Sequence, residues 1–373
     1  MTQIQKEQVR PARIETWLWL ANAVGYAAAQ AKGILSMYEN PEVLYGERCT
    51  TDLSMLLTPR QLQILQHTEP EDFIARKDDC AAQNVSILPY GAQDYPVLLC
   101  ETDAPPIVLY YRGDIRIPNH SLTFAMVGTR RPSAYGVEAT RALAAPLAKA
   151  GVVLVSGLAT GLDSESHKCA VAAGTPTIAC IAFGHDICYP AANRTLKGVI
   201  EKQGLVISEY PPGTKVEKEY FLQRNRLIAG LSYGVCVAEA RRASGTMNTV
   251  STALRYNRDV FSVPGSIFSP LCEGTNHLLC EGAIPAVSAQ DILAYYGIDA
   301  ETTAEQETKE KSEILLSSEA KQVQAQLLCT PQSLTALCAK TNLPPHKIMA
   351  ALTELELAGI SSQQAGRQFV LIH

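Results

Sequence analysis

The sequence predicts an α/β protein: a parallel β-sheet covered by helices, preceded by a helical domain and followed by a small domain of helices and a hairpin. Two observations lead to this prediction. From residue 122 to about residue 298, short apolar runs alternate with amphipathic stretches, and strands that alternate with helices are typical of a parallel sheet with both faces covered. Residues 1 to about 80 instead show apolar side chains at helical spacings, without strand alternation.

The first 84 residues predict a small all-helical domain. Residues 14–38 carry apolar side chains at mixed helical spacings. A further helix is expected after Thr58, because Thr58 is a good N-cap and Pro59 suits the first helical position. Residues 85–118 are rich in Pro and Tyr, which favours tight turns and short extended pieces.

The central domain is expected over residues 85–298. Its buried strands are predicted at the runs LTFAMV, VVLVS, TIACIA, LVISE, GVCVAEA and DVFSVPG. Ligands bind beyond the carboxyl ends of the strands in sheets of this kind. The loops expected at those ends are rich in Gly, Ser, Thr and Arg, so candidate functional residues are sought there.

The C-terminal part predicts a linker and a winged helix-turn-helix. Residues 299–319 are polar and acidic, which is typical of a linker. Residues 320–373 contain three helix signals and end in a short hairpin with a turn near Gly366. The third helix offers Lys347 beside several acidic residues, whereas a helix that reads the major groove normally carries more Arg or Lys. We expect a protein-contact or regulatory role, with weak duplex binding as the alternative.

Length and composition narrow the class of protein. At about 100–200 residues per domain, 373 residues predict two or three domains. No apolar run approaches the ~18–20 residues of a membrane helix, and the N-terminus lacks the apolar segment of a secretory signal. The 11 cysteines are scattered without a CxxC pair, which suits a reducing compartment. We expect a cytoplasmic protein without a membrane partner.

The charge distribution indicates a local anionic ligand. The net charge is −5, but residues 121–290 hold 16 Lys and Arg against 12 Asp and Glu, while the rest of the chain holds 16 against 25. A basic centre in an acidic protein favours a nucleotide or a nucleic acid held at one place. The pI of about 5.9 argues against nonspecific coating of duplex DNA.

Two turns after predicted strands are candidate anion sites. Gly128, Thr129 and Arg130 lie between a strand and a helix, where backbone N–H groups and a guanidinium suit phosphate. Ser156 and Gly157 open the second turn, SGLATGLD, whose glycines leave the backbone accessible. The dinucleotide fingerprint GxGxxG and the Walker A motif are both absent, so NAD and ATP lack their usual sequence support.

The second turn also contains an acidic residue and a histidine four positions apart. Asp163 and His167 share one helical face. An acid–base pair is one interpretation. We favour the structural one, in which Asp163 caps the helix and the imidazole is packed and oriented by the neighbouring carboxylate.

The run KVEKEYFLQRNR, residues 215–226, is the most informative segment. It places Arg224, Asn225 and Arg226 just after Phe221. Cations beside an aromatic ring suit single-stranded nucleic acid, because the cations follow the backbone while the ring stacks a base, worth ~1–3 kcal/mol per base. The alternative is a solvated helix start with the ring in the core.

The turn after GVCVAEA offers a third set of anion-binding candidates and an enzymatic alternative. Ser244, Gly245, Thr246 and Asn248 lead into a helix. The Gly-Thr pair resembles the GGxGTxxE signature of lysine-decarboxylase-like phosphoribohydrolases, but Thr249 stands where that family has its catalytic glutamate. With no GxSxG elbow, HExxH motif or other metal-ligand spacing, we expect no enzyme activity, no metal and no cofactor.

Together these motifs resemble the bacterial DNA-processing protein A family, DprA, also called Smf. The resemblance runs from about residue 90 to residue 293, over half the chain, and ten motifs occur in the family's order. They are DYP (94–96), PIVLY (106–110), VGTR (127–130), SGLATGLD with His167, YP (189–190), SE (208–209), FLQRNRLIAGLS (221–232), AEARRASGTMNT (238–249), SVPG (262–265) and GTN (274–276).

The resemblance implies an extended Rossmann-like domain that binds single-stranded DNA and loads the RecA recombinase onto it during natural transformation. It also implies a non-catalytic protein that forms a homodimer through this domain. The helical N-terminus (SAM-like) and the winged-helix C-terminus match the family's usual accessory domains.

Individual roles also follow from the resemblance. The phosphate-binding arginine of the family is Arg130 here, and the stacking aromatic is Phe221. The pocket lysine is Lys218, with Lys215 as the rival. The predicted DNA-binding residues are Gly128, Thr129, Arg130, Ser156, Gly157, Lys215, Lys218, Phe221, Arg224, Asn225, Arg226, Ser244, Gly245, Thr246 and Asn248.

One departure from the family concerns the Y-P-x-x-N loop. The family often carries a basic residue between Pro and Asn, but this chain has Ala191 and Ala192 there. The departure removes positive charge from the rim of the expected site, and we expect weaker binding as a result.

Overall fold

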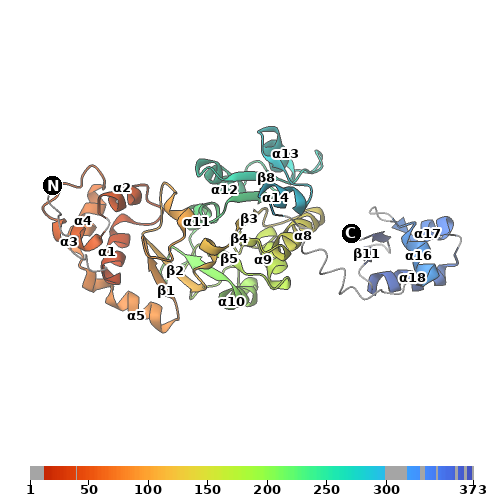
Figure 1. Cartoon of the computed structure of the whole chain (residues 1–373), viewed down its shortest axis with the longest axis horizontal. Helices are drawn as coiled ribbons and strands as arrows, with labels where there is room; N and C mark the ends of the chain where they lie inside the picture. Colours follow the sequence, from red (N-terminus) through yellow and green to blue (C-terminus); the bar gives the residue numbers. More distant parts are fainter. Residues whose placement is uncertain are drawn as a thin grey trace. The chain divides into compact units, whose positions relative to one another are not determined.

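The computed structural model describes residues 12–38, 40–298, 317–327, 332–341, 343–357, 360–364 and 368–371. It divides the chain into two compact units, residues 1–300 and residues 301–373 (Figure 1). The predicted acidic linker falls mainly on residues 299–316, which lie outside the described residues. Each unit is therefore treated separately below.

A nine-stranded sheet forms the centre of the first unit, in the order β1-β2-β6-β5-β4-β3-β7-β8-β9. From β6 to β9 in this spatial order, each strand is parallel to its neighbours. At one edge β2 pairs antiparallel with β6, and β1 pairs antiparallel with β2. The strands are β1 Ser86–Pro89, β2 Val108–Gly113, β3 Thr123–Val127, β4 Val153–Ser156, β5 Thr177–Ile181, β6 Leu205–Ser208, β7 Gly234–Val237, β8 Asp259–Ser262 and β9 Ile284–Pro285. The six predicted strands are β3 to β8, so the predicted parallel sheet is confirmed.

The strand order reverses between β3 and β7. From β3 the chain adds β4, β5 and β6 on one side, and it then returns to add β7, β8 and β9 on the other. The two central strands pair in parallel, with Val127 opposite Val237 at their carboxyl ends. A crevice opens at such a switch point because the connections leave in opposite directions.

Helices cover both faces of the sheet. Alternate β3 residues separate the two layers: Ala125 packs with Leu227 of α11 and Val250 of α12, whereas Phe124 packs with Leu143 of α8. The helices are α6 Val97–Cys100, α7 Ile117–His120, α8 Ala134–Lys149, α9 Leu162–Ala172, η2 Ala191–Asn193, α10 Arg194–Gln203, α11 Lys218–Gly230, α12 Gly245–Arg255, α13 Glu273–Cys280 and α14 Ala289–Tyr295.

The N-terminal helices pack on the β1–β2 edge of the same unit. They are α1 Ile14–Val24, α2 Gln30–Met37, α3 Pro41–Glu47, α4 Pro59–His67, η1 Pro70–Phe73 and α5 Ile74–Ala82. Thr58 caps α4 with a reciprocal capping box and Pro59 follows it, as predicted. Trp19 of α1 and Tyr110 of β2 belong to one buried cluster, so the helices and the sheet share a core.

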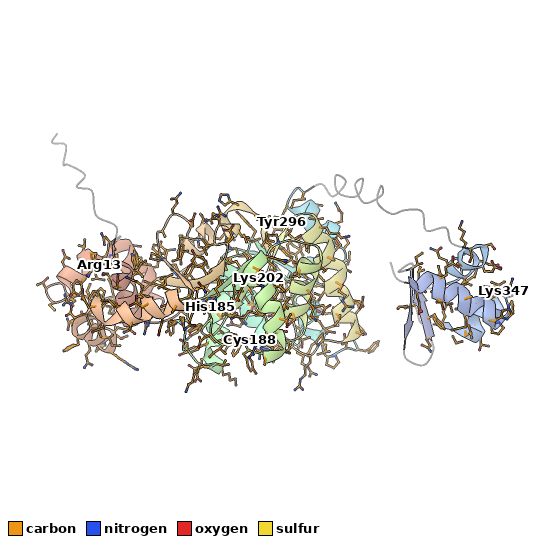
Figure 2. The ribbon with its side chains drawn as sticks, turned by 90° about the horizontal axis from the view of Figure 1, so that it is seen from below. Arg13, His185, Cys188, Lys202, Tyr296 and Lys347 are labelled. Atoms are coloured by element: carbon orange, nitrogen blue, oxygen red, sulfur yellow. The ribbon has the colours of Figure 1, made fainter. Side chains whose placement is uncertain are left out.

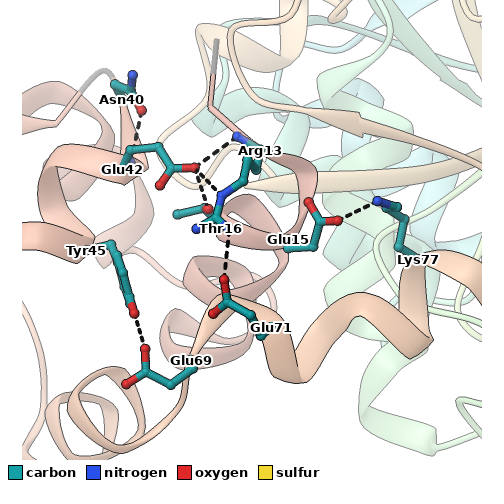
Figure 3. A network of polar contacts seen from close by, with 9 residues as sticks. All are labelled: Arg13, Glu15, Thr16, Asn40, Glu42, Tyr45, Glu69, Glu71 and Lys77. Atoms are coloured by element: carbon teal, nitrogen blue, oxygen red, sulfur yellow. Dashed lines mark hydrogen bonds and ion pairs between the residues drawn. The ribbon is translucent and has the colours of Figure 1, made fainter. Parts of the chain in front are cut away.

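A polar network ties the N-terminal helices together at the surface. Arg13 contacts Glu42 at 3.2 Å and Glu71 at 2.8 Å, so it joins α3 to η1 (Figure 3). The pairing with these carboxylates raises the pKa of Arg13 and lowers the pKa of Glu71. Exposed pairs of this kind contribute little stability individually.

The described residues of the second unit form three helices and a three-stranded antiparallel sheet, which confirms the winged-helix prediction. Its elements are α16 Ser318–Gln324, β10 Gln332–Ser333, α17 Leu334–Thr341, α18 Pro345–Leu357, β11 Ser361–Gln364 and β12 Gln368–Leu371, with the sheet order β10-β12-β11. Leu337, Ile348 and Phe369 pack in its core. The predicted turn at Gly366 lies outside the described residues.

Two general features apply to the whole described chain. No described helix combines the length and the apolarity needed to cross a membrane. The ten cysteines in the described part of the chain are free thiols, and Figure 2 labels one of them, Cys188, which lies in the connection after β5.

Candidate functional site

A pocket of about 420 Å³ lies at the switch point between β3 and β7. It is built from the turn after β3, the turn after β4, helix α11 and the start of α12. We call it the switch-point pocket. Ten predicted site residues line it: Gly128, Thr129, Arg130, Lys218, Phe221, Arg224, Asn225, Ser244, Gly245 and Thr246.

The turn after β3 is held tightly against its neighbours. The Thr129 N–H donates to the Glu239 carbonyl oxygen at 2.8 Å. A Cβ on Gly128 would lie 2.4 Å from Leu162 Cδ1 and 3.0 Å from the Glu239 carbonyl oxygen. Only glycine therefore fits at 128, and the tight turn fixes the direction in which the next residues leave the sheet.

Arg130 projects from this turn over the ring of Phe221. The guanidinium carbon Cζ lies 5.1 Å from the ring centroid, a distance at which cation and ring attract. Arg130 is exposed and forms no ion pair with any residue that the structure describes. Its guanidinium is therefore free to bind an anion while the ring below it helps to fix its position.

Phe221 lies at the mouth of the pocket. Its side chain is partly exposed, and its ring lies 5.7 Å from that of Tyr189 with an interplanar angle of 57°. Tyr189 is half exposed. The alternative that placed Phe221 in the core holds in part, because the side chain packs against the outside of a buried cluster that includes Phe183 and Tyr210 while remaining partly exposed.

Helix α12 presents its N-terminus to the pocket. Ser244 occupies the N-cap position, but its side chain makes no capping hydrogen bond, so the N–H groups of Gly245 and Thr246 keep no intrahelical partner. Thr246 Oγ1 donates to the Gly128 carbonyl oxygen at 3.2 Å. Free N–H groups and the helix dipole make this end of α12 suitable for an anion.

Asn225 connects α11 to α12 beside this N-terminus. Its side-chain amide donates to the Gly245 carbonyl oxygen at 3.2 Å and contacts Asn248 Oδ1 at 3.4 Å. Asn248 itself is exposed next to the pocket and is not among its lining residues. The amide bridge therefore holds the two helices that carry the pocket's opposite walls.

Arg224 forms part of the pocket floor. It is 3 % exposed, and Nη1 donates to the carbonyl oxygens of Gly157 and Cys180. Burial lowers the pKa of Arg224. Ser156 and Gly157 are not among the lining residues of the pocket, and Ser156 Oγ donates to the Met126 carbonyl oxygen at 2.6 Å. Both residues were predicted to contact DNA directly. In the structure Gly157 instead supports the pocket, because its carbonyl oxygen holds the Arg224 guanidinium.

Arg226 requires a clear correction. It is 5 % exposed, it forms a buried ion pair with Glu209, and Nη1 donates to the Ala104 carbonyl oxygen at 2.6 Å. Arg226 is one residue after Asn225, and neighbouring residues of a helix do not share a face, so its side chain reaches Glu209 and Ala104 and is not among the pocket's lining residues. The structure removes Arg226 from the predicted interface.

The two candidate lysines are placed differently. Lys218, the first residue of α11, lines the pocket. Lys215 lies before the helix, is exposed, and is not among the lining residues. The residues of α11 that line the pocket are at positions 218, 221, 222, 224, 225 and 228, and most of them are three or four residues apart, as expected for one side of a helix.

Asp163 and His167 do not form an acid–base pair. Gly161, not Asp163, occupies the N-cap position of α9, and the Asp163 carboxylate accepts the Gly157 N–H at 3.1 Å. His167 is fully buried, and its Nδ1 hydrogen bonds to Thr177 Oγ1 at 2.8 Å. Both the predicted cap and the predicted carboxylate partner of the histidine are wrong, because the loop before α9 folds back under Asp163.

The position of the phosphoribohydrolase glutamate carries no carboxylate in this chain, although the buried Asp163 is among the residues that line the pocket. Thr249, at the position of the phosphoribohydrolase glutamate, lines the pocket with an uncharged side chain. The nearby Glu239 is fully buried, and its carboxylate accepts both the N–H and the hydroxyl of Ser133, at 2.9 and 2.6 Å. No group of acidic, His or Cys side chains with metal-binding geometry occurs among the described residues.

The sequence and the geometry agree with one family. Residues 86–297 match the family described as DNA recombination-mediator protein A, and residues 306–367 match the DprA winged helix domain. The chain belongs to the DNA recombination-mediator protein A family. Protein Smf from Synechocystis is 33 % identical over 323 residues, which cover 77 % of this chain and 80 % of that protein. DprA from Bacillus subtilis is 39 % identical over 211 residues, 57 % of this chain and 71 % of that protein.

Two solved DprA structures share the fold. The structure of DprA from Streptococcus pneumoniae superposes with a TM-score of 0.61 at 34 % identity, covering 76 % of this chain and 98 % of that one. DprA from Helicobacter pylori, whose structure was described for its single-stranded DNA binding mode, gives a TM-score of 0.51 at 32 % identity, covering 57 % of this chain and 95 % of that one.

Proposed function

We propose that this DprA-family chain binds single-stranded DNA in the switch-point pocket. The observation that carries the proposal is the placement of the exposed Arg130 guanidinium 5.1 Å from the Phe221 ring at the mouth of one pocket. A guanidinium neutralises a phosphate, and a partly exposed ring offers its face to a base. The pair therefore supplies both contacts that an unpaired strand needs.

The rest of the pocket supports an unpaired strand over a duplex. Lys218 adds a second cation, and the N-terminus of α12 adds uncapped N–H groups. Bases in a duplex are already stacked and cannot lie on a protein ring, whereas bases of a single strand can. The family's description as a recombination mediator and the DNA-binding mode of the H. pylori relative support the same proposal.

A finer role follows from the family. We infer that the bound strand is handed to the RecA recombinase during natural transformation, that the chain acts as a homodimer, and that it does so without catalysis. The winged-helix unit is proposed to contact a protein. Lys347 of α18 is paired with Glu319 of α16 at 3.0 Å, which supports this role because the pairing reduces the positive charge available for duplex DNA.

The proposal is tested by titrating oligothymidylate at several salt concentrations. With ~3–5 phosphates neutralised, the slope of log affinity against log salt is expected to be about −2 to −3.5. A duplex of matched length is the control and should bind more weakly. Absence of salt-sensitive single-strand binding would contradict the proposal.

RecA loading and catalysis need separate measurements. RecA filament growth on a strand coated with single-strand binding protein should start sooner when this chain is present, and unchanged kinetics would contradict the loading role. Incubation with nucleoside monophosphates tests the phosphoribohydrolase alternative. Release of free base, abolished by Glu239→Gln, would favour that alternative.

A further inference from the structure

A second pocket, of about 360 Å³, lies beside the switch-point pocket at the carboxyl ends of β3, β7 and β8. It is lined by Ser133, Tyr135, Glu239, Gly265, Ser266, Ser269 and Cys272. Glu239 joins the two pockets: its carbonyl oxygen accepts the Thr129 N–H in the wall of the first, and the residue is part of the lining of the second. We call the second one the β8-loop pocket.

The loop that forms this pocket, residues 264–272, is fixed at its base. Asn276 of α13 accepts the Gly265 N–H at 3.1 Å and donates to the Gly265 carbonyl oxygen at 3.0 Å. The Tyr135 hydroxyl of α8 donates to the Pro264 carbonyl oxygen. The loop is thus held from two helices, one on each side, and its outer residues have a defined position.

The tip of the loop exposes two large apolar side chains. Phe268 is 90 % exposed and Ile267 is 83 % exposed. The Phe268 N–H donates to Ser266 Oγ at 3.2 Å, and the Ser269 N–H donates to the Ser266 carbonyl oxygen at 3.0 Å. A turn therefore holds an aromatic ring in solvent at the edge of a pocket, where exposure of so much apolar surface is unfavourable without an occupant.

Unpaired cations flank the same edge. Arg131 follows the turn after β3, and Arg241 and Arg242 follow β7, and all three are exposed. None of them forms an ion pair with a residue in the described part of the chain. The start of α13 fixes the second turn, because the Gly274 N–H donates to the Ala240 carbonyl oxygen at 2.9 Å. Three free guanidinium groups thus lie on the two turns that separate the pockets.

We propose that the β8-loop pocket, with Phe268 at its rim, is a second subsite for the DNA strand that leaves the switch-point pocket. This inference rests on the proposed function. The strand would cross the turns that carry Arg131, Arg241 and Arg242, which neutralise its phosphates, and one base would stack on Phe268 and enter the pocket. Continuity through Glu239 and the positive charge of the turns favour a nucleic acid as the occupant.

The lining of the pocket fits a base and not a phosphate. The Glu239 carboxylate is buried and accepts hydrogen bonds from the N–H and the hydroxyl of Ser133, and its negative charge would repel a phosphate. Ser133, Ser266 and Ser269 add hydroxyl groups that both donate and accept. A protein partner covering the two apolar side chains is the competing occupant, and the experiment below distinguishes it.

The test compares oligothymidylates of about 4 to 20 nucleotides on the full chain and on variants of the loop tip. In the wild type, affinity should rise with strand length until the switch-point pocket is filled. It should rise a second time when the strand is long enough to reach the β8-loop pocket. Phe268→Ala should lower affinity for the long strands by about 5-fold or more and leave that for the shortest strands unchanged. Phe268→Trp should restore the long-strand affinity, and its fluorescence should be quenched when a base stacks on it.

Ile267→Ala is the matched control, because it removes a neighbouring exposed apolar side chain without removing a ring. It should bind strands of every length as the wild type does. Equal binding of Phe268→Ala and the wild type at every length would overturn the second subsite while the proposed function stands. Loss of self-association by Phe268→Ala in the absence of DNA, with unchanged DNA binding, would also overturn it in favour of a protein contact. If the wild type bound no strand at all, the proposed function itself would fail.

Discussion

Arg224 is hydrogen bonded to the backbone of Gly157: its Nη1 donates to the Gly157 carbonyl oxygen at 2.5 Å and also to the carbonyl oxygen of Cys180. Helix α11 is thereby fixed to the carboxyl ends of β4 and β5. Phe221, one turn earlier on α11, is held at the mouth of the switch-point pocket by this attachment. The position of Phe221 in the pocket therefore depends on the hydrogen bonds of Arg224 to Gly157 and Cys180, which a ligand bound at Phe221 does not need to contact.

Gly157→Ala should destabilise the first unit by about 1–3 kcal/mol. The new Cβ would lie 2.5 Å from Arg224 Nη1, so the buried guanidinium must give up hydrogen bonds. Urea unfolding followed by tryptophan fluorescence measures this, because both tryptophans of the chain, Trp17 and Trp19, lie in the first unit. Gly198→Ala in α10 is the control, since a Cβ there meets nothing within 4 Å. Equal stability of the two variants would contradict the tight contact.

Arg130→Ala should weaken single-strand binding and reduce the steepness of its salt dependence by about 0.7, the contribution of one phosphate contact. The fold should be unaffected, because Arg130 is exposed and its guanidinium lies over the Phe221 ring at the surface. Lys202→Ala, which removes an exposed cation from the end of α10, is the matched control and should bind as the wild type does. An unchanged slope in Arg130→Ala would show that the guanidinium meets no phosphate.

The two candidate lysines should differ in their effect. Lys218→Ala should lower both the affinity and the salt slope, because Lys218 lines the pocket. Lys215→Ala should leave both close to wild type, since Lys215 lies outside the lining. The same titration measures both variants, and the reverse order of effects would assign the pocket lysine to Lys215.

Arg226→Met should lower the free energy of unfolding and leave the affinity for single-stranded DNA unchanged. Removing one partner of a buried ion pair costs about 3–5 kcal/mol, because the remaining Glu209 carboxylate stays buried without its partner. Replacing both residues by apolar ones should cost less than the sum of the single changes. Urea unfolding measures the loss, and titration is done on the folded fraction. A stable Arg226→Met variant with lost binding would restore Arg226 to the interface.

Stability should fall as the pH decreases below about 6.5. Burial, with a contribution from the Arg224 charge, lowers the pKa of His167 to about 3, and burial lowers the pKa of His185 to about 3. Below pH 6.5 these two histidines bind protons in the unfolded chain but stay neutral in the folded chain. The free energy of unfolding therefore drops by up to ~1.4 kcal/mol per pH unit for each histidine. The loss should continue until the pH approaches 3.

The urea midpoint of the first unit, measured from pH 7.5 to 4.5, checks this dependence. His167→Gln should have a shallower dependence than the wild type, because it removes one of the two groups. If the variant and the wild type have the same slope, the buried imidazole does not account for the acid sensitivity.

Local patterns in the sequence were enough to predict most of the fold. Alternation of apolar runs with amphipathic stretches predicted β3 to β8 and their helices. The spacing of apolar residues that distinguishes a strand from a helix can be read from consecutive residues of the sequence. The turn at Arg130 could be placed at a strand end for the same reason. The antiparallel strands β1 and β2 were anticipated only as short extended pieces, because their pairing with β6 joins segments far apart in the chain.

The candidate site was predicted in its motifs but not in its geometry. In the sequence, residues 215–226 appear as one cluster of charge. In the folded helix, Arg226 pairs with the buried Glu209, whereas Lys218 and Phe221 line the pocket. Cys180 and Gly157, which hold Arg224, carry no signal of that role in the chain, because they act through their backbone carbonyl groups.

The sequence by itself determined which elements form and in which turns an anion can be bound, because hydrogen bonding and apolar periodicity are local properties. Tertiary structure decided which cations remain free and which are buried in pairs. Whether a guanidinium meets a carboxylate, a carbonyl group or solvent depends on residues brought beside it from distant parts of the chain, as Glu209 shows for Arg226 and Gly157 for Arg224.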